Sequence, residues 1–324
     1  MITLIQLEYI VAVDTHRHFA QAAEHCFVTQ PTLSMQIKKL EDDLGIKIFD
    51  RSKQPVIPTD IGQEVLERAR GVLAGAEGIN DLVKHHLKDY SGELRVGIIP
   101  TLAPYLLPLF AGTLKKDFPG VILYFEELIT ERIAEKLHKG QLDAGVFVTP
   151  FNDPGIVEQH VFYEEMLVYA HPEHKLAGKE HVRVADAAQP DIWLLSDGHC
   201  FRNQVVNLCS YKPQEHNELP FSLEGGSLET LIRVIDREGG FTLIPELACA
   251  SLNPEQKNNL IQFSDARPVR EVSVCYSRYY IKRRLIQLLI DEIRKAVPMQ
   301  MLRGRWCTQE LTLQEPMCQA LILR

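Results

Sequence analysis

A change in the spacing of apolar residues near residue 90 most limits how this chain can fold. Upstream of "DYSGE" (89–93), apolar residues recur every three or four positions, which is the period of helices. Downstream, short apolar runs such as "LRVGII" alternate with helix patterns of about ten to fifteen residues. Such alternation is typical of α/β domains with a parallel sheet. We therefore expect a mainly helical N-terminal part followed by an α/β part.

Four segments follow from these patterns. Residues 1–58 contain three helix patterns and two short strands around "IKIFDRSKQPVIPT", and residues 59–89 form one long amphipathic helix pattern. Residues 90–300 form the α/β part, large enough for one domain or two smaller ones, and the tail 301–324 fits neither pattern. The strands expected in the α/β part span 94–99, 121–128, 143–148, 167–171, 191–196, 241–245 and 272–277.

The overall composition excludes some classes of protein. A net charge of −8 disfavours non-specific coating of nucleic acid, which depends on phosphate neutralisation, but it permits a small DNA-reading surface. No run of about 18 apolar residues predicts a membrane span, and the N-terminus lacks the basic start of a signal peptide. The seven cysteines are odd in number and irregularly spaced, which argues against a secreted disulfide framework. We therefore expect a cytoplasmic protein with no membrane contact.

The helix pattern of residues 59–89 carries an apolar stripe that needs a partner. Its members recur at threes and fours: Ile61, Val65, Ala69, Val72, Ala76, Ile79 and Val83, widened by Leu66, Leu73 and Leu82. The partner we expect is the same helix of a second copy, which makes a dimer. Packing against the chain's own domains is the alternative.

Residues 18–45 have the pattern of a helix-turn-helix. A helix pattern from His18 to about Cys26 is followed by the turn "FVTQP" and by the third helix of the chain, which ends at Gly45. Polar side chains at the start of that helix would reach base edges in a major groove, and basic side chains would contact phosphates. The expected DNA-binding residues are Thr29, Gln30, Thr32, Ser34, Gln36, Lys38, Lys39, Arg51 and Lys53.

The local charge supports DNA binding only weakly. Residues 1–60 carry six Lys or Arg and eight Asp or Glu, and Glu41, Asp42 and Asp43 lie at the far end of the third helix. A helical protein-interaction module fits the same pattern, so the residues alone leave both interpretations open.

The stretch "LLSDGHCFRNQVVNLC" carries Cys200 and Cys209, with His199 directly before the first. Both thiols could be buried packing residues, or they could bind a metal with His199 and His216, or they could be a reactive pair. Their spacing matches no standard zinc pattern, and we expect neither a metal nor another cofactor.

The local pattern favours the reactive pair. "DIWLLS" predicts a strand and "CFRNQVVNL" a short helix, so Cys200 would lie in the first turn, where the helix dipole, His199 and Arg202 favour a thiolate. Nine residues of helix advance about 13.5 Å, whereas a disulfide needs Cα atoms within about 7 Å. Pairing with Cys209, which is expected to be buried beside an apolar stripe, would therefore unwind the helix.

Two threonines indicate where an oxidant would bind. Thr101 and Thr130 follow the first and second expected strands of the α/β part, and Cys200 follows a later one. Ligands of open α/β sheets bind beyond the carboxyl ends of strands, so the three groups could share one pocket. A threonine in such a place is more often only a helix cap, and that alternative stays open.

The stretch "FAQAAEHCFVTQPTLSMQIKKLEDDLGIKIFDR" resembles the signature of LysR-type transcriptional regulators, and "SLETLIRVIDREGGFTLIP" resembles their effector domain. The resemblance implies a winged helix-turn-helix, a dimerising linker helix and an effector domain of two α/β subdomains, similar to periplasmic binding proteins. It also implies promoter DNA as a partner, a homotetramer built as a dimer of dimers, and contact with RNA polymerase.

The segment "DGHCFRNQVVNLC" further resembles the redox segment of those family members that sense hydrogen peroxide. Carried over, Cys200 reacts with peroxide and Cys209 resolves it into a disulfide, which cytosolic dithiol proteins would reduce. The implied function is an activator of oxidative-stress genes, not an enzyme. The pocket residues would be Thr101, Thr130, His199 and Arg202.

Three other functions fit parts of the same sequence. A LysR-type regulator that binds a small molecule in the cleft between the subdomains would need no reactive cysteine. A thiol enzyme built on Cys200 and His199 would turn over its substrate, but the sequence shows no separate group that orients the histidine. A solute-binding protein would share the α/β pattern without the N-terminal helices.

Overall fold

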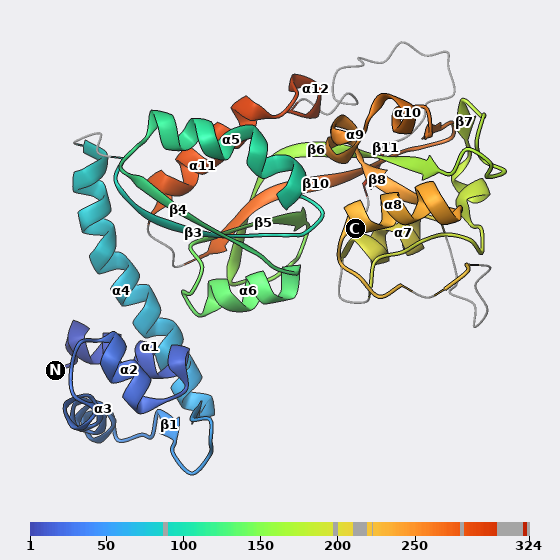
Figure 1. Ribbon diagram of the computed structural model, residues 1–324. Coiled ribbons are helices and arrows are strands. Elements are labelled where there is room, and N and C mark those ends of the chain that lie inside the picture. Colours follow the sequence, from blue (N-terminus) through green and yellow to red (C-terminus); the bar gives the residue numbers. More distant parts are fainter. Residues whose placement is uncertain are drawn as a thin grey trace, which may run out of the picture.

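The computed structural model describes residues 1–86, 90–196, 200–209, 219–221, 223–278, 282–302 and 320–322. A small N-terminal domain, a long helix and a larger α/β domain follow one another along the chain (Figure 1). The two domains have separate apolar cores.

The N-terminal domain has the expected winged helix-turn-helix arrangement. It contains helices α1 (Leu4–His16), α2 (Phe19–His25) and α3 (Gln30–Leu44) and the antiparallel strands β1 (Phe49–Asp50) and β2 (Ile57–Pro58). The helix ends follow from their sequences. Thr3 forms a capping box with Gln6, the Thr29 hydroxyl accepts the amide of Thr32, and Gly45 ends α3 in the left-handed conformation at φ 69°.

Helix α4 (Asp60–His86) leads from the N-terminal domain to the α/β domain (Figure 1). Its apolar stripe divides into two parts. Leu66 and Ala69 are buried in the N-terminal core, whereas five others stay exposed: Ile61, Val72, Ile79, Leu82 and Val83. In the described ranges no helix, α4 included, is long and apolar enough to cross a membrane.

The described part of the α/β domain holds one mixed sheet of nine strands. Its main path runs β4 (Val121–Glu127), β3 (Gly92–Ile98), β5 (Ala144–Thr149), β10 (Arg267–Ser277), β6 (Ile156–Ala170), β9 (Leu260–Phe263) and β7 (His181–Val182). β8 (Phe241–Pro245) also pairs with β6, and β11 (Ala320–Ile322) with β10. β3 is parallel to β4 and β5, but β10 is antiparallel to both β5 and β6. The expected parallel arrangement is present in β3, β4 and β5, but it is wrong for the centre of the sheet, where β6 and β10 form an antiparallel pair.

The α/β domain has two subdomains, as expected, and the structure adds that they share β6 and β10. The first subdomain adds β3, β4 and β5 with helices α5 (Ala103–Asp117), α6 (Thr130–His138) and α11 (Arg283–Ala296). The second adds β7, β8 and β9 with α7 (Cys200–Leu208), α8 (Leu228–Glu238), α9 (Glu246–Ser251) and α10 (Pro254–Lys257). α12 (Met299–Leu302) follows α11 and packs on β6.

Three stretches differ from the sequence expectation. β6 begins eleven residues earlier than expected, at Ile156, because charged residues such as Glu158 and Glu164 interrupt its apolar pattern. Residues 191–196 form no strand, and only Ile192 makes a single bridge, to Phe241. In the tail, Ala320–Ile322 forms β11, which lies parallel to the start of β10.

The N-terminal domain touches the first subdomain at the end of α6. The Thr15 hydroxyl of α1 donates to the carbonyl of Lys139, the residue that follows α6, at 3.2 Å. The opposite end of the same helix, at Thr130, belongs to the pocket described next.

Candidate redox site and DNA interface

The polar side chains of α3 lie on the outer side of the N-terminal domain, because Leu33, Ile37 and Leu40 of the same helix face the core. Thr29 and Thr32 share a hydrogen bond of 2.8 Å between their hydroxyls, which fixes the start of the helix. Ser34 and Gln36 are half-buried. The other predicted DNA-binding side chains are exposed: Thr29, Gln30, Thr32, Lys38, Lys39, Arg51 and Lys53.

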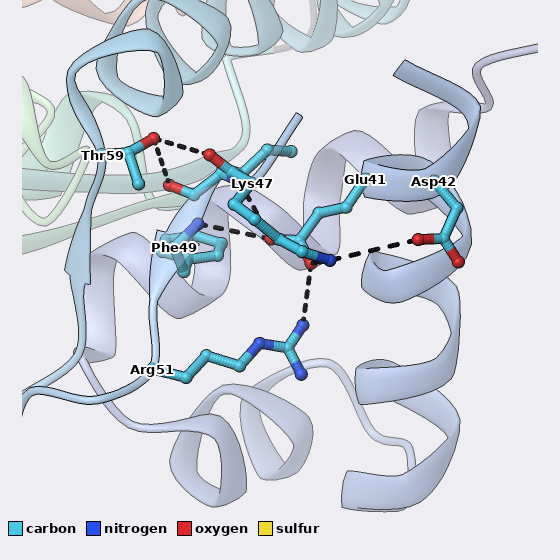
Figure 2. A network of polar contacts seen from close by, with 7 residues as sticks. Glu41, Asp42, Lys47, Phe49, Arg51 and Thr59 are labelled. Carbon is cyan, nitrogen blue, oxygen red and sulfur yellow. Dashed lines mark hydrogen bonds and ion pairs between the residues drawn. The ribbon is translucent and has the colours of Figure 1, made fainter. Parts of the chain in front are cut away.

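A buried carboxylate holds the wing, which is the hairpin of β1 and β2, against α3. Glu41 accepts the amides of Ile48 at 2.9 Å and Phe49 at 3.4 Å on one oxygen. Its other oxygen lies 3.2 Å from Arg51 and 3.5 Å from Lys47 (Figure 2). Glu41 is only 1% exposed, so these partners compensate a buried charge. In the sequence, Glu41 is one of three acids at the far end of the third helix. In the structure, it is the residue that attaches the wing to that helix.

This attachment changes the expectation for Arg51. Its guanidinium pairs with Glu41 and lies 4.9 Å from the centre of the Phe19 ring. Because 42% of the Arg51 side chain is exposed, the side of the guanidinium that faces away from Glu41 can still contact a phosphate. The geometry therefore gives Arg51 a structural contact in addition to the predicted phosphate contact.

A small pocket lies where the two subdomains meet. The structure brings Thr101, Thr130 and Cys200 to its walls, together with Ile99, Pro100, Ile129, Val148, Phe201 and Arg270. The cavity volume is about 10 Å³, close to the minimum that holds one water molecule. The pocket therefore suits a ligand of a few atoms.

Cys200 is the first residue of α7 and faces this pocket. Its Sγ lies 3.2 Å from the Thr130 hydroxyl and 4.0 Å from Oε1 of Glu131. Burial raises the pKa of the Cys200 thiol, the hydrogen bond with Thr130 lowers it, and the charge of Glu131 raises it, with a net increase. This direction is opposite to the one expected from the helix N-terminus and nearby cations, because burial has the largest effect.

Arg202, one of the two cationic groups expected near Cys200, does not line the described pocket. Arg202 donates from Nη1 to the carbonyl of Leu195 at 3.1 Å and is absent from the pocket walls. His199 lies outside the described residues.

Arg270 of β10 supplies the positive charge of the pocket instead. Its Nε and Nη2 lie 2.9 and 2.8 Å from Oε2 of Glu164, and both side chains are fully buried. Nη1 donates to the Thr101 hydroxyl at 2.9 Å and Nη2 donates to the Thr101 carbonyl at 3.1 Å. Oε1 of Glu164 accepts the amide of Leu247 at 2.8 Å. Arg270 therefore orients Thr101 in the pocket, and Glu164 neutralises it.

Cys209, at the other end of α7, has an apolar environment. It directly follows the helix, is 2% exposed and belongs to the core that includes Val205 and Leu208. Burial raises its pKa to about 12. Both Cys200 and Cys209 are free thiols, and the intact helix separates them.

The alternative of a metal site finds no support in the described part of the chain. Among those residues, no group of three or more His, Cys, Asp or Glu side chains is arranged to hold a metal ion. His199 and His216, which that alternative required, lie outside the described residues.

Comparisons with known proteins agree with this architecture. The profile of the bacterial regulatory helix-turn-helix protein, lysR family, matches residues 4–63, and that of the LysR substrate binding domain matches residues 88–298. The chain belongs to the LysR family. The small helical domain is thus the DNA-binding domain of a LysR-type transcriptional regulator, and the α/β domain is its effector domain.

Several LysR-type relatives extend over most of this chain. The DNA-binding transcriptional dual regulator OxyR of Escherichia coli K12 is 34% identical over 291 residues, which is 89% of this chain and 93% of that protein. The hydrogen peroxide-inducible genes activator of Haemophilus influenzae is 33% identical over 270 residues, covering 83% and 89%. A full-length OxyR variant from Pseudomonas aeruginosa has a similar structure, with a TM-score of 0.76, 33% identity and coverage of 92% and 99%. These relatives are transcriptional regulators, and this LysR-type chain is likewise a regulator and not an enzyme.

Three buried charged residues of this LysR-type protein were not identified from the sequence: Glu41, Glu164 and Arg270. Glu41 was named only as one of three acids at the far end of the third helix, and no role was expected for Glu164 or Arg270. The only signal in the sequence was the number of charges in the two strands: Glu164 is followed by Glu165 in β6, and Arg270 lies between Arg267 and Glu271 in β10.

Proposed function

We propose that this LysR-type protein is a transcription regulator that responds to hydrogen peroxide through Cys200 and Cys209. The observation that carries the proposal is the position of Cys200, whose Sγ lies 3.2 Å from Thr130 in a pocket that also holds Thr101 and Arg270. The regulators named for hydrogen peroxide among its relatives support the same signal.

The chemistry needs peroxide and two thiols. The Cys200 thiolate attacks one peroxide oxygen, the O–O bond breaks, and the products are a sulfenic acid and, after protonation, water. The Cys209 thiol then attacks the sulfenic sulfur, an S–S bond forms, and a second water leaves. Peroxide is reduced by two electrons and the two thiols are oxidised by two. A reducing dithiol protein of the cytoplasm would return the pair to the thiol state.

The reaction requires a change of structure. The helix α7 separates the two thiols by nine residues, or about 13.5 Å along its axis, whereas a disulfide needs Cα atoms within about 7 Å. The bond therefore forms only if α7 unwinds and Cys209 leaves its apolar environment. Covalent trapping of such an unwound segment is a two-state switch.

The dimensions of the pocket favour peroxide over a larger effector. A cavity of about 10 Å³ has no room for a metabolite, but two oxygen atoms fit with small adjustments of the walls. Thr101 and Thr130 can hydrogen-bond to these oxygens, because hydroxyls both donate and accept.

The regulator would bind promoter DNA through α3 and the wing. The exposed part of the α4 stripe supports dimerisation with a second copy, and a dimer of dimers would give the homotetramer that the family resemblance implies. Unwinding of α7 would change contacts between effector domains, re-angle the DNA-binding pairs and recruit RNA polymerase to oxidative-stress genes.

Thiol-trapping mass spectrometry of the purified protein tests the proposal. After about one equivalent of peroxide, we expect a peptide in which Cys200 and Cys209 are linked, and dithiothreitol should remove the link. Cys200→Ser should abolish both the link and the peroxide response of a reporter promoter, whereas Cys249→Ser serves as the matched control. A reporter that still responds in Cys200→Ser would favour the small-molecule effector instead.

A further inference from the structure

Glu131 is a charged side chain in recorded contact with Cys200. It is the second residue of α6, directly after Thr130, and its Oε1 lies 4.0 Å from Sγ, the far limit for a hydrogen bond donated by a thiol. Its side chain is exposed at the rim, whereas Thr130 is buried.

The described cations near the pocket have partners other than Glu131. Arg270 is neutralised by Glu164 within 2.9 Å, and two more of its N–H groups donate to the hydroxyl and the carbonyl of Thr101. On α6, Arg132 pairs with Glu135 at 2.7 Å. Arg202 on α7 turns to the carbonyl of Leu195. Among the described residues, the carboxylate of Glu131 is the charged group recorded in contact with the Cys200 sulfur.

We propose that Glu131 is a brake on the sensor: its carboxylate repels the negative charge that Cys200 must carry to attack peroxide, and so it sets the peroxide concentration at which the protein responds. The proposal rests on the function proposed above. Glu131 is a tuning residue and not a catalytic one, because it accepts no proton in the reaction and the thiol proton leaves to solvent.

Coulomb's law sets the size of the effect. Two unit charges 4 Å apart repel each other in water by enough to reduce the thiolate population about five-fold. Cys200 is partly buried, and the repulsion between two charges is stronger where water is excluded. The five-fold reduction in thiolate is therefore a lower bound. The direction agrees with the increase in the pKa of Cys200 to which Glu131 contributes.

The experiment measures thiolate formation without peroxide. The reduced full-length protein is alkylated with iodoacetamide between pH 6 and pH 10, and mass spectrometry follows the Cys200 peptide. In E131Q the alkylation midpoint should move to lower pH, and alkylation at pH 7 should be about five-fold faster. E131D keeps the charge and should stay close to the wild type. E127Q removes an exposed carboxylate of β4 instead and should leave the profile unchanged.

The peroxide reaction supplies the second readout. Oxidation of Cys200 by limiting peroxide should be about five-fold faster in E131Q, and the reporter should respond at correspondingly lower peroxide. Slower reaction in E131Q would overturn the proposal, since it would make Glu131 a proton acceptor. An unchanged profile, or an equal shift in E127Q, would overturn it as well.

Repeating the measurement in an H199Q background separates the effect of Glu131 on Cys200 from that of His199, which directly precedes Cys200 in the sequence. The shift caused by E131Q should persist in H199Q, and its disappearance there would assign the effect to the histidine. The two proposals also fail differently. A shift without a peroxide-induced Cys200–Cys209 link would refute the proposed function, whereas a link without a shift would refute the brake alone.

Discussion

The two ends of α7 carry the same functional group in opposite surroundings. Cys200 meets a hydroxyl at 3.2 Å, a carboxylate at 4.0 Å and a pocket lined by Arg270. Cys209 lies among apolar side chains and is 2% exposed. The comparison separates the two tasks of a disulfide switch. One end provides the chemistry, and the other provides the packing energy that must be lost for the bond to form.

The largest expected difference between the two ends is chemical reactivity. With a pKa of about 12, roughly one Cys209 thiol in ten thousand is ionised at pH 8, against about a quarter for an ordinary thiol. Iodoacetamide at pH 8 should therefore modify Cys209 at least about a thousand-fold more slowly in the folded protein than in urea. Quantitative mass spectrometry measures both rates, and comparable rates would remove the distinction between the ends.

The same pKa shift predicts a dependence of stability on pH. The folded chain binds more protons than the unfolded chain between the ordinary thiol pKa and about 12, so the free energy of unfolding falls as pH rises through this range. The contribution of Cys209 should approach 1.4 kcal/mol per pH unit there. Cys209→Ala should make the slope shallower by this amount in urea titrations at pH 9 to pH 11. An unaltered slope would contradict the burial of Cys209.

Removing packing at the Cys209 end should stabilise the switched state relative to the reduced one. Leu208→Ala should lower the free energy of unfolding of the reduced protein by about 2–5 kcal/mol, the cost of a cavity in a core. The disulfide form should lose much less, because α7 is then unwound. Leu109→Ala, at an exposed site of α5, is the control. Equal losses in both redox forms would mean that α7 keeps its packing after oxidation.

Thr101 tests how the chemical end is organised. Thr101→Val leaves a buried donor of Arg270 without its acceptor and should cost about 1–3 kcal/mol in the free energy of unfolding, measured by urea titration. Thr101→Ser keeps the hydroxyl and should restore most of it. If the Thr101→Val and Thr101→Ser variants have the same free energy of unfolding, the hydrogen bond from Arg270 to the Thr101 hydroxyl does not contribute to stability.

The smallest effect is expected at Thr130. Its hydrogen bond lowers the pKa of Cys200, so Thr130→Val should raise that pKa further. A neutral hydrogen bond contributes about 1 kcal/mol, which is about a five-fold decrease in thiolate. Iodoacetamide labelling of Cys200 at pH 7 measures the change, and faster labelling would reverse the role assigned to Thr130.

Local sequence patterns predicted much of this molecule. Thr29 and Gly45 mark the limits of α3 by capping chemistry that needs no tertiary contact. The segment from Cys200 to Leu208 forms the expected helix, and Cys209 falls next to its apolar face. Thr101 and Thr130 could be placed together because they follow β3 and β4, whose ends share one edge of the sheet. The strand expected before Cys200 does not form, so the position of Cys200 beside Thr130 depends on tertiary packing.

The missed features depend on contacts between residues far apart in the sequence. Arg270 and Glu164 are separated by about a hundred residues, and each would be costly to bury without the other. Neither position alone predicts the pair. The antiparallel course of β10 was missed for a similar reason, since its direction is set by pairing with β6 and not by its own residues.

The pairing of β6 with β10 also has a mechanical consequence. β6 and β10 connect the two subdomains as one hydrogen-bonded pair of strands, which twists more easily than it stretches. The register shift between Val272 and Ser273 is a bulge, where a strand bends and twists more strongly, two residues beyond Arg270. Rotation of one subdomain against the other would therefore twist the β6–β10 pair close to Arg270, which lines the redox pocket.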